Sequence, residues 1–229
     1  MELAIFNPIF EHRQTAGLLH RSQALSFIVL GMVIRTSGQL WTLISETVDD
    51  IRSGTFRKFL LQPISFPLYF QARVIGPKTI TWIMGATALI ILRRYEAFSG
   101  LLPMAKLLPF LLSLSVGMLL TWQIYLGIVY VGFWMEEVAF LSVAFNIGCG
   151  IFSGTLIPLS WLPDALQKVL WFTPLPYLGD IPVRTGLGML SEAEWANYFF
   201  MGILWFFGLL AINSVLKHLG FRRYEAFGG

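Results

Sequence analysis

Charged residues inside or beside long apolar stretches are the ones whose chemistry most needs explaining in this sequence. Arg35 falls near the middle of an apolar run, where a charge costs about 2.5 kcal/mol or more unless it meets a partner or water. It faces either a substrate path or a neighbouring subunit, or else the run is shifted toward the N-terminus and Arg35 reaches an interface. Gly31, Ser37, Gly38 and Gln39 would permit close helix packing beside it.

A second group of charges surrounds residues 55–62, which read TFRKFLLQ. The three large apolar residues of this stretch share one helical face. Gly54 and Pro63 bound it, because proline disfavours helical geometry at the residue before it. We predict a short amphipathic helix over 55–62, which must bury its apolar face in lipid headgroups or in a groove on another protein. The charges around it are Asp49, Asp50, Arg52, Arg57 and Lys58.

Glu136 and Glu137 occupy a tight turn between two strongly apolar blocks. Two carboxylates in such a turn keep it in water. The alternative is that they contact a cytoplasmic partner.

Catalytic and cofactor-binding patterns do not stand out. The histidines His12, His20 and His218 lack the spacing of a zinc site. Residues 76–79 resemble the end of a phosphate-binding loop but lack its upstream glycine. Any use of ATP therefore requires a partner chain, and we expect no cofactor on this one. The scattered basic residues form no stripe suited to nucleic acid.

Composition predicts an integral membrane protein. Of 229 residues, 56% are hydrophobic and 13% charged, against about 25% charged in soluble domains. About 20 apolar residues in a helix cross the hydrocarbon layer. Because the blocks are too long and too unalternating for barrel strands, we predict an all-α polytopic transmembrane bundle as a single domain. The five predicted spans are 24–44, 73–92, 107–132, 138–157 and 192–216.

Four further features belong to this topology. Apolar residues recur at helical spacing over 162–170, between Trp161 and Trp171, which predicts an interfacial helix. Ser191 and Glu194 form a capping box at the start of the fifth span. Basic residues divide almost evenly between the two faces, although their density in 45–72 favours the inside. The sequence RRYEAF occurs at 93–98 and 222–227, which this topology places on opposite faces.

Three stretches together resemble one known family. They are DDIRSGTFRKFLLQPISFPLYFQAR (49–73), FSGTLIPLSWLPDAL (152–166) and GFRRYEAFGG (220–229). The chain resembles the membrane-spanning permease subunits of type-2 ABC exporters of bacteria and archaea, in order and over nearly its whole length. The family has six spans. The sequence predicts five and lacks the first, so either the assigned start falls too late or the chain is a shortened form.

The resemblance implies a multi-pass permease of the cytoplasmic membrane. It would pair with a second permease, identical or paralogous, and with a cytoplasmic ATPase dimer that carries ATP and magnesium. The loop matching 49–63 would be the coupling helix that docks on the ATPase. By carry-over, the coupling residues are Asp49, Asp50, Arg52, Gly54, Arg57, Lys58 and Pro63.

Two other classes remain alternatives. A structural or assembly subunit of a membrane complex is compatible with the missing span. An intramembrane lipid-modifying enzyme would need clustered histidines or acidic residues at one membrane face. The substrate does not follow from the sequence, because fold does not fix cargo.

Overall fold

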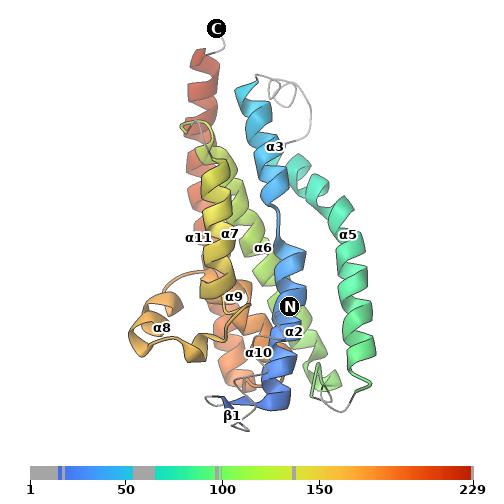
Figure 1. Cartoon of the computed structure of the whole chain (residues 1–229). Helices are drawn as coiled ribbons and strands as arrows, with labels where there is room; N and C mark the ends of the chain where they lie inside the picture. Colours follow the sequence, from blue (N-terminus) through green and yellow to red (C-terminus); the bar gives the residue numbers. More distant parts are fainter. Residues whose placement is uncertain are drawn as a thin grey trace.

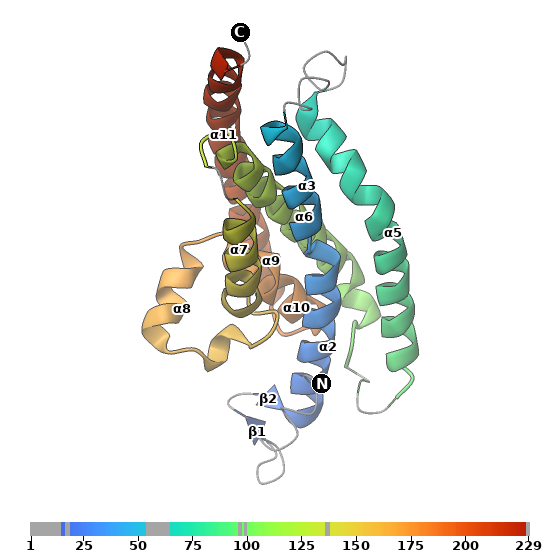
Figure 2. The same cartoon turned by 45° about the horizontal axis from the view of Figure 1, so that its top comes forward.

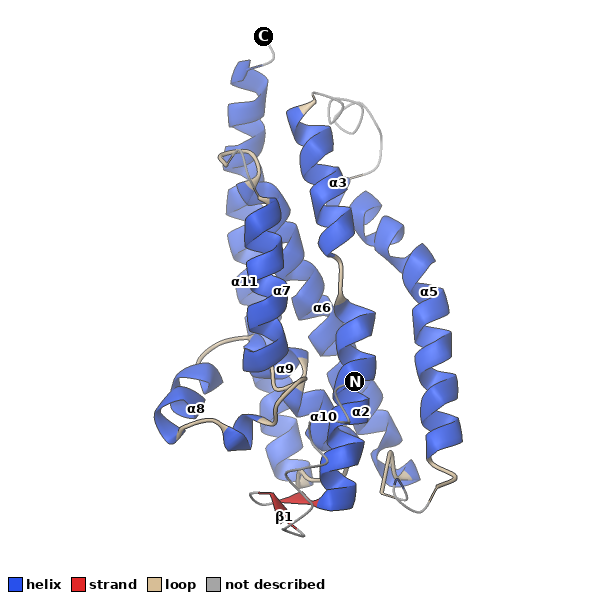
Figure 3. Ribbon diagram, in the orientation of Figure 1, coloured by secondary structure: helices blue, strands red, loops and turns tan. Residues whose placement is uncertain are grey.

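The long apolar stretches form helices, which satisfy their backbone groups internally, as a bilayer requires. The computed structural model describes residues 15–16, 19–53, 65–95, 98, 100–135 and 138–227 (Figure 1). The long helices are α2 (Arg21–Gly38), α3 (Trp41–Arg52), α5 (Phe66–Leu92), α6 (Leu107–Val131), α7 (Ala139–Phe152) and α11 (Glu192–Phe227). The predicted all-α membrane fold is confirmed; within the described part, strands form only a two-residue-per-strand hairpin, β1 (Thr15–Ala16) with β2 (Leu19–His20) (Figure 3).

Short helices supply the connections. They are η2 (Met104–Lys106), η3 (Leu159–Trp161), α8 (Asp164–Trp171), α9 (Leu175–Leu178) and α10 (Asp180–Gly186). Figure 2 shows β1–β2 at one end of the bundle, which we call the hairpin end. The opposite end, where α3 and α11 finish and α5 begins, is the C-terminal end (Figure 1). The described parts of the two RRYEAF copies lie at opposite ends, since residues 93–95 follow α5 and residues 222–227 finish α11.

Four helical stretches among the described residues are long and apolar enough to cross a membrane: 23–51, 66–92, 104–131 and 192–223. The predicted fourth span, 138–157, is shorter as a helix. α7 has 14 residues and is therefore about 21 Å long, against a hydrocarbon layer of about 30 Å. The chain leaves helical geometry after Phe152, which periodicity alone did not indicate.

α6 is the central helix, packed against α2, α3, α9, α10 and α11. Its pairing with α11 includes a buried polar contact: Asn213 Nδ2 donates to Gln123 Oε1 at 2.6 Å and to the Gln123 carbonyl at 2.8 Å. Gly127 leaves room for Asn213, because a Cβ there would lie 2.9 Å from Asn213 Oδ1. Small residues and interhelical hydrogen bonds hold helices together where lipid supplies no hydrophobic drive.

The first predicted span, 24–44, is interrupted. α2 ends at Gly38 and α3 begins at Trp41, with Leu40 at φ −129° and ψ 11°. Thr36 Oγ1 donates to the Met32 carbonyl at 2.9 Å and Ser37 Oγ to the Val33 carbonyl at 2.7 Å. Such back-bonding bends helices, and Gly38 is a poor helix former. The span is therefore two helices in series (Figure 3).

α5 and α11 present mostly exposed apolar surfaces. Ile80, Ile83 and Ile90 of α5 are all more than 60% exposed, as suits helices that face lipid or another membrane chain. Pro77 lies inside α5, where its ring removes a backbone hydrogen bond and kinks a helix; the helix is visibly bent (Figure 1). The predicted capping box at the start of α11 is confirmed: Ser191 N donates to Glu194 Oε2 at 2.9 Å and Glu194 N to Ser191 Oγ at 3.3 Å.

The segment after α7 folds back into the bundle. Gly154 has φ +78°, a conformation that glycine adopts without strain, and a Cβ there would lie 2.7 Å from Asp180 Cβ. Asp180 N donates to the Ser153 carbonyl at 2.7 Å. These contacts fix the start of α10 against the end of α7. The predicted interfacial helix 162–170 corresponds closely to α8, of which Leu170 is buried while Val169 is 61% exposed.

Candidate coupling and transport sites

The loop that carries most of the predicted coupling residues lies outside the described residues. This applies to the predicted helix 55–62 and to Gly54, Arg57, Lys58 and Pro63. It applies equally to Glu136 and Glu137. The described chain does include both roots of the loop, which are the end of α3 and the start of α5. Of the other predicted coupling residues, Asp49, Asp50 and Arg52 belong to the last turns of α3.

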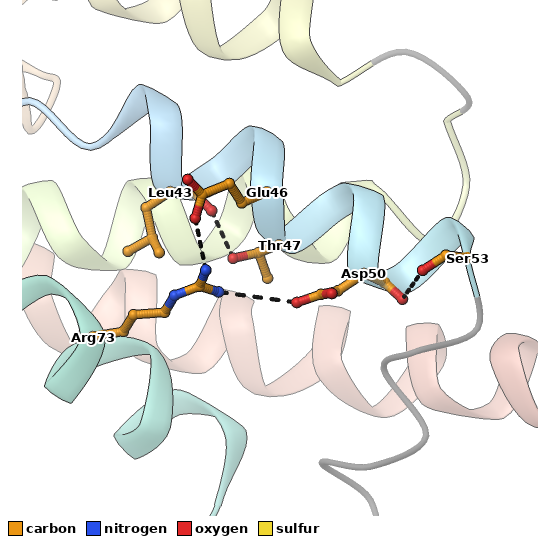
Figure 4. Close-up of polar contacts among 6 residues, drawn as sticks. All are labelled: Leu43, Glu46, Thr47, Asp50, Ser53 and Arg73. Carbon is orange, nitrogen blue, oxygen red and sulfur yellow. Dashed lines mark hydrogen bonds and ion pairs between the residues drawn. The ribbon is translucent and has the colours of Figure 1, made fainter.

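The two roots of the loop are joined by an ion pair (Figure 4). Arg73 of α5 reaches across to α3, where its Nη2 lies 2.6 Å from Glu46 Oε2 and its Nη1 lies 3.9 Å from Asp50 Oδ2. The Arg73 side chain is about one-third exposed. We call Glu46, Asp50 and Arg73 the root clamp. Its main pair joins residues that are 27 positions apart in sequence, so that α3 and α5 are held together just before the loop.

Glu46 and Arg73 were not predicted as members of this site. Glu46 and Asp50 are four residues apart and therefore share one helix face, which the sequence does show. Their common partner lies on the next helix, and only the tertiary pairing reveals it. Exposed ion pairs contribute about 0–1 kcal/mol, so the clamp orients the two helices more than it stabilises the fold.

Arg35 lies at the interruption of the first span, in the last turn of α2. The helical stretch runs from residue 23 to 51, so Arg35 is about 18 Å from one end and about 24 Å from the other along the axis. Because this stretch is longer than the hydrocarbon layer of about 30 Å, its placement in the membrane decides between the two alternatives for Arg35, and both stand. The guanidinium packs on α7: a Cβ at Gly150 would lie 3.2 Å from Arg35 Cζ.

A cavity of about 40 Å³ opens beside Arg35, between α2, α6, α7 and the segment that follows α7. We call it the Arg35 pocket. Asn146 Nδ2 donates to the Tyr125 hydroxyl at 3.2 Å on its wall. Arg35 Nε is buried and has no hydrogen-bond partner among the described residues. The lining residues are Ile34, Arg35, Gly38, Gln39, Thr121, Tyr125, Phe145, Asn146, Cys149, Gly150, Ser153, Thr155 and Leu178.

A second cavity, of about 310 Å³, lies on the α5 side of the same interruption. Lys78 of α5 donates from Nζ to the Thr36 carbonyl at 2.9 Å. A cation is favourable there, because the last carbonyls of a helix carry partial negative charge. Gln39 lines both cavities. The interruption is therefore flanked by a cavity on each side, and broken helices are tolerated in membrane proteins where they are buried in protein or line a cavity.

A further candidate site, formed by Asp180 and Arg184 on α10, was not predicted from the sequence. Asp180 Oδ2 lies 3.6 Å from Arg184 Nη1, and this oxygen makes no hydrogen bond within the described part of the chain. Burial raises the pKa of the Asp180 carboxyl to about 6, against the smaller opposing effect of Arg184. Both residues line a cavity of about 210 Å³ with Gln167, Trp171 and others. An i, i+4 pair in a connecting segment gives no sequence signal of burial.

Metal chemistry has no visible support: over the described ranges, no three His, Cys, Asp or Glu side chains gather where they could hold an ion.

Comparison with known proteins identifies a family for the chain as a whole. The model of the family described as "ABC-2 family transporter protein" matches residues 10–228, almost the entire chain. No curated protein is significantly similar to it.

Proposed function

The chain belongs to the ABC-2 family of transporter proteins, and from this premise we propose that it is the permease subunit of an ATP-driven exporter. A separate cytosolic ATPase dimer supplies the energy, with ATP and magnesium bound there. A second permease, identical or paralogous, completes the pathway in the cytoplasmic membrane. The permease itself makes and breaks no covalent bonds.

The root clamp is the observation that carries this proposal. A partner that moves the 54–64 loop pulls on both of its roots. Because Arg73 ties α5 to Glu46 and Asp50 of α3, the two helices respond together rather than separately. Motion of the loop thereby becomes motion of two transmembrane helices, which is what coupling to a cytosolic motor requires.

The interruption at residues 39–40 is the hinge about which α3 moves relative to α2. α3 joins α2 through two non-helical residues, and short non-helical joints absorb the dihedral changes of hinged elements. In this mechanism α3 and α5 tilt with the ATPase while α2 remains packed against α10. Access to the space around Arg35 then alternates between the two sides of the membrane.

Charge reversal in the loop tests the ATPase contact. Arg57→Glu with Lys58→Glu should abolish copurification with the ATPase, because it reverses the charge beside the apolar face of the predicted helix, the face proposed to dock in the ATPase groove. Membrane insertion should stay intact. The matched control is Arg93→Glu with Arg94→Glu, two adjacent exposed arginines at the other end of α5, which should leave copurification unchanged. Unchanged recovery of the ATPase with the loop variant would refute the docking assignment.

A further inference from the structure

We infer that the Arg35 pocket binds an anionic oxygen group, a carboxylate or a phosphate, on the molecule that this permease moves. The inference rests on the proposed transport function and adds the chemical class of its substrate. Arg35 is the residue that determines this preference.

The first support is uncompensated charge. None of the residues that line the pocket is acidic, and no carboxylate in the described ranges forms an ion pair with Arg35. Asp180, the buried carboxylate at the start of α10, pairs with Arg184 instead. A guanidinium buried in an apolar helical bundle without a counter-ion is unfavourable. A bound anion removes that cost.

The second support is the donor set. Arg35 Nε is buried without a partner in the described structure, so a donor of the guanidinium is left for a ligand. The Tyr125 hydroxyl accepts from Asn146 Nδ2 and can still donate its own hydrogen. Oxyanions accept several such hydrogen bonds, and those from charged donors are the stronger ones. The pocket therefore offers charge and donors together, as a carboxylate or phosphate needs.

The third support is the size of the pocket. A volume of about 40 Å³ accommodates about three water molecules, so the pocket takes a small polar head and not a whole ligand. Apolar side chains also line the pocket, among them Ile34, Phe145 and Leu178. The geometry suits an amphiphile whose anionic group enters the pocket while its apolar part stays among these side chains.

Cys149 lines this pocket and is the only cysteine in the chain. The rate at which charged reagents label it therefore measures the electrostatic potential in the pocket without any engineered residue. The full-length permease in phosphatidylcholine nanodiscs is treated with two methanethiosulfonate reagents, one bearing a sulfonate and one a trimethylammonium group. Each labelling rate is divided by that reagent's rate with a small thiol in solution. The normalised ratio of anionic to cationic labelling should be about tenfold, because one unpaired positive charge nearby concentrates the anion.

Three variants separate Arg35 from its surroundings. Arg35→Gln should reduce the labelling ratio to about one, and Arg35→Lys should keep most of it because the charge is retained. Arg94→Gln, which removes an exposed arginine after α5, should leave it unchanged. If Arg35→Gln does not fold, the lysine variant and the wild-type ratio still decide. A wild-type ratio near one would overturn the inference. Where neither reagent reaches Cys149, thermal unfolding decides: inorganic phosphate or phosphatidylglycerol should raise the Tm of the wild type and not of Arg35→Gln, and equal Tm values would overturn the inference.

The source of the anion is resolved by protection. Slower anionic labelling of Cys149 on adding phosphatidylglycerol at constant ionic strength identifies a lipid headgroup. Slower labelling with inorganic phosphate alone identifies a soluble anion, and protection by neither overturns the inference. These measurements need no ATPase. Loss of charge preference with intact ATPase copurification would remove the substrate class alone, and the reverse result would remove the coupling role alone.

Discussion

Asp180 shows how one residue's chemistry depends on where the fold places it. Its side chain is 3% exposed and Arg184, its ion-pair partner, is 29% exposed. Burial disfavours the ionised carboxylate more than the arginine favours it, so the pKa rises to about 6 from 3.8. A pKa raised on folding means that the folded protein binds the proton more tightly than the unfolded chain. The contribution of Asp180 to stability is therefore complete below about pH 4 and is lost as the pH rises through about 6.

Asp180→Asn should accordingly stabilise the protein above pH 7. The rise from 3.8 to about 6 corresponds to about 3 kcal/mol at most, and loss of the ion pair with Arg184 reduces the gain. Thermal unfolding in detergent should show a higher Tm for the variant at pH 7.5 and converging values near pH 4. Asp164→Asn, an exposed aspartate at the start of α8, is the control and should show no such gain. A lower Tm for Asp180→Asn at pH 7.5 would mean that the ion pair outweighs burial.

At the residue scale, the sequence singles out a residue whose type conflicts with its surroundings. Arg35 stood out because it is a cation in an apolar run, and the structure places it beside a cavity. Asp180 did not stand out, because an aspartate in a connecting segment looks solvated until the fold buries it. Whether Arg35 contacts substrate remains the prediction tested by Cys149 labelling.

At the scale of elements, the root clamp joins the two helices that flank the proposed coupling loop. Arg73 lies near the start of α5, while Glu46 and Asp50 lie one turn apart on α3. If the clamp transmits motion, its loss must uncouple the helices without unfolding them, since a partly exposed ion pair contributes about 1 kcal/mol or less.

Arg73→Glu should therefore lower the permease-dependent ATPase rate of the purified complex about fivefold, equivalent to about 1 kcal/mol. Copurification of the ATPase should persist, because the loop itself is unchanged. Glu46→Arg combined with Arg73→Glu restores the main pair with reversed polarity and should recover most of the rate. Arg94→Glu, at the far end of the same helix, serves as the control. Equal rates for wild type and Arg73→Glu would show that the clamp has no part in coupling.

The helices themselves were largely predictable and their interruptions were not. Long apolar runs predicted helices that overlap α5, α6 and α11, and the Ser191–Glu194 capping box marked the start of α11. The break between α2 and α3 has only weak local signals, in Thr36, Ser37 and Gly38, because hydropathy continues through it. Its support comes from Lys78, 42 residues from Thr36 in sequence, and such contacts are invisible to periodicity.

Over the whole molecule, the burial pattern fits a chain that shares the membrane with other subunits and lipid. The apolar stretch that contains α6 is 39% buried, whereas those of α5 and α11 are only 6% and 11% buried. The family match covers residues 10–228, so the fold and the membrane role apply to the chain as a unit. Beyond the family, we propose a direction of transport, an ATPase as the motor and an anionic group on the cargo. The direction and the motor depend on the 54–64 loop facing the cytosol.

Sidedness of that loop is the most direct test. In a Cys149→Ser background, Arg57→Cys and Arg94→Cys place single thiols beyond opposite ends of α5, and a membrane-impermeant maleimide is added to intact cells and to inverted membrane vesicles. A cytosolic loop predicts that the Arg94→Cys variant is labelled in intact cells and the Arg57→Cys variant only in inverted vesicles. Labelling of the Arg57→Cys variant from outside intact cells would contradict the proposed coupling, because a loop on that face cannot contact a cytosolic ATPase.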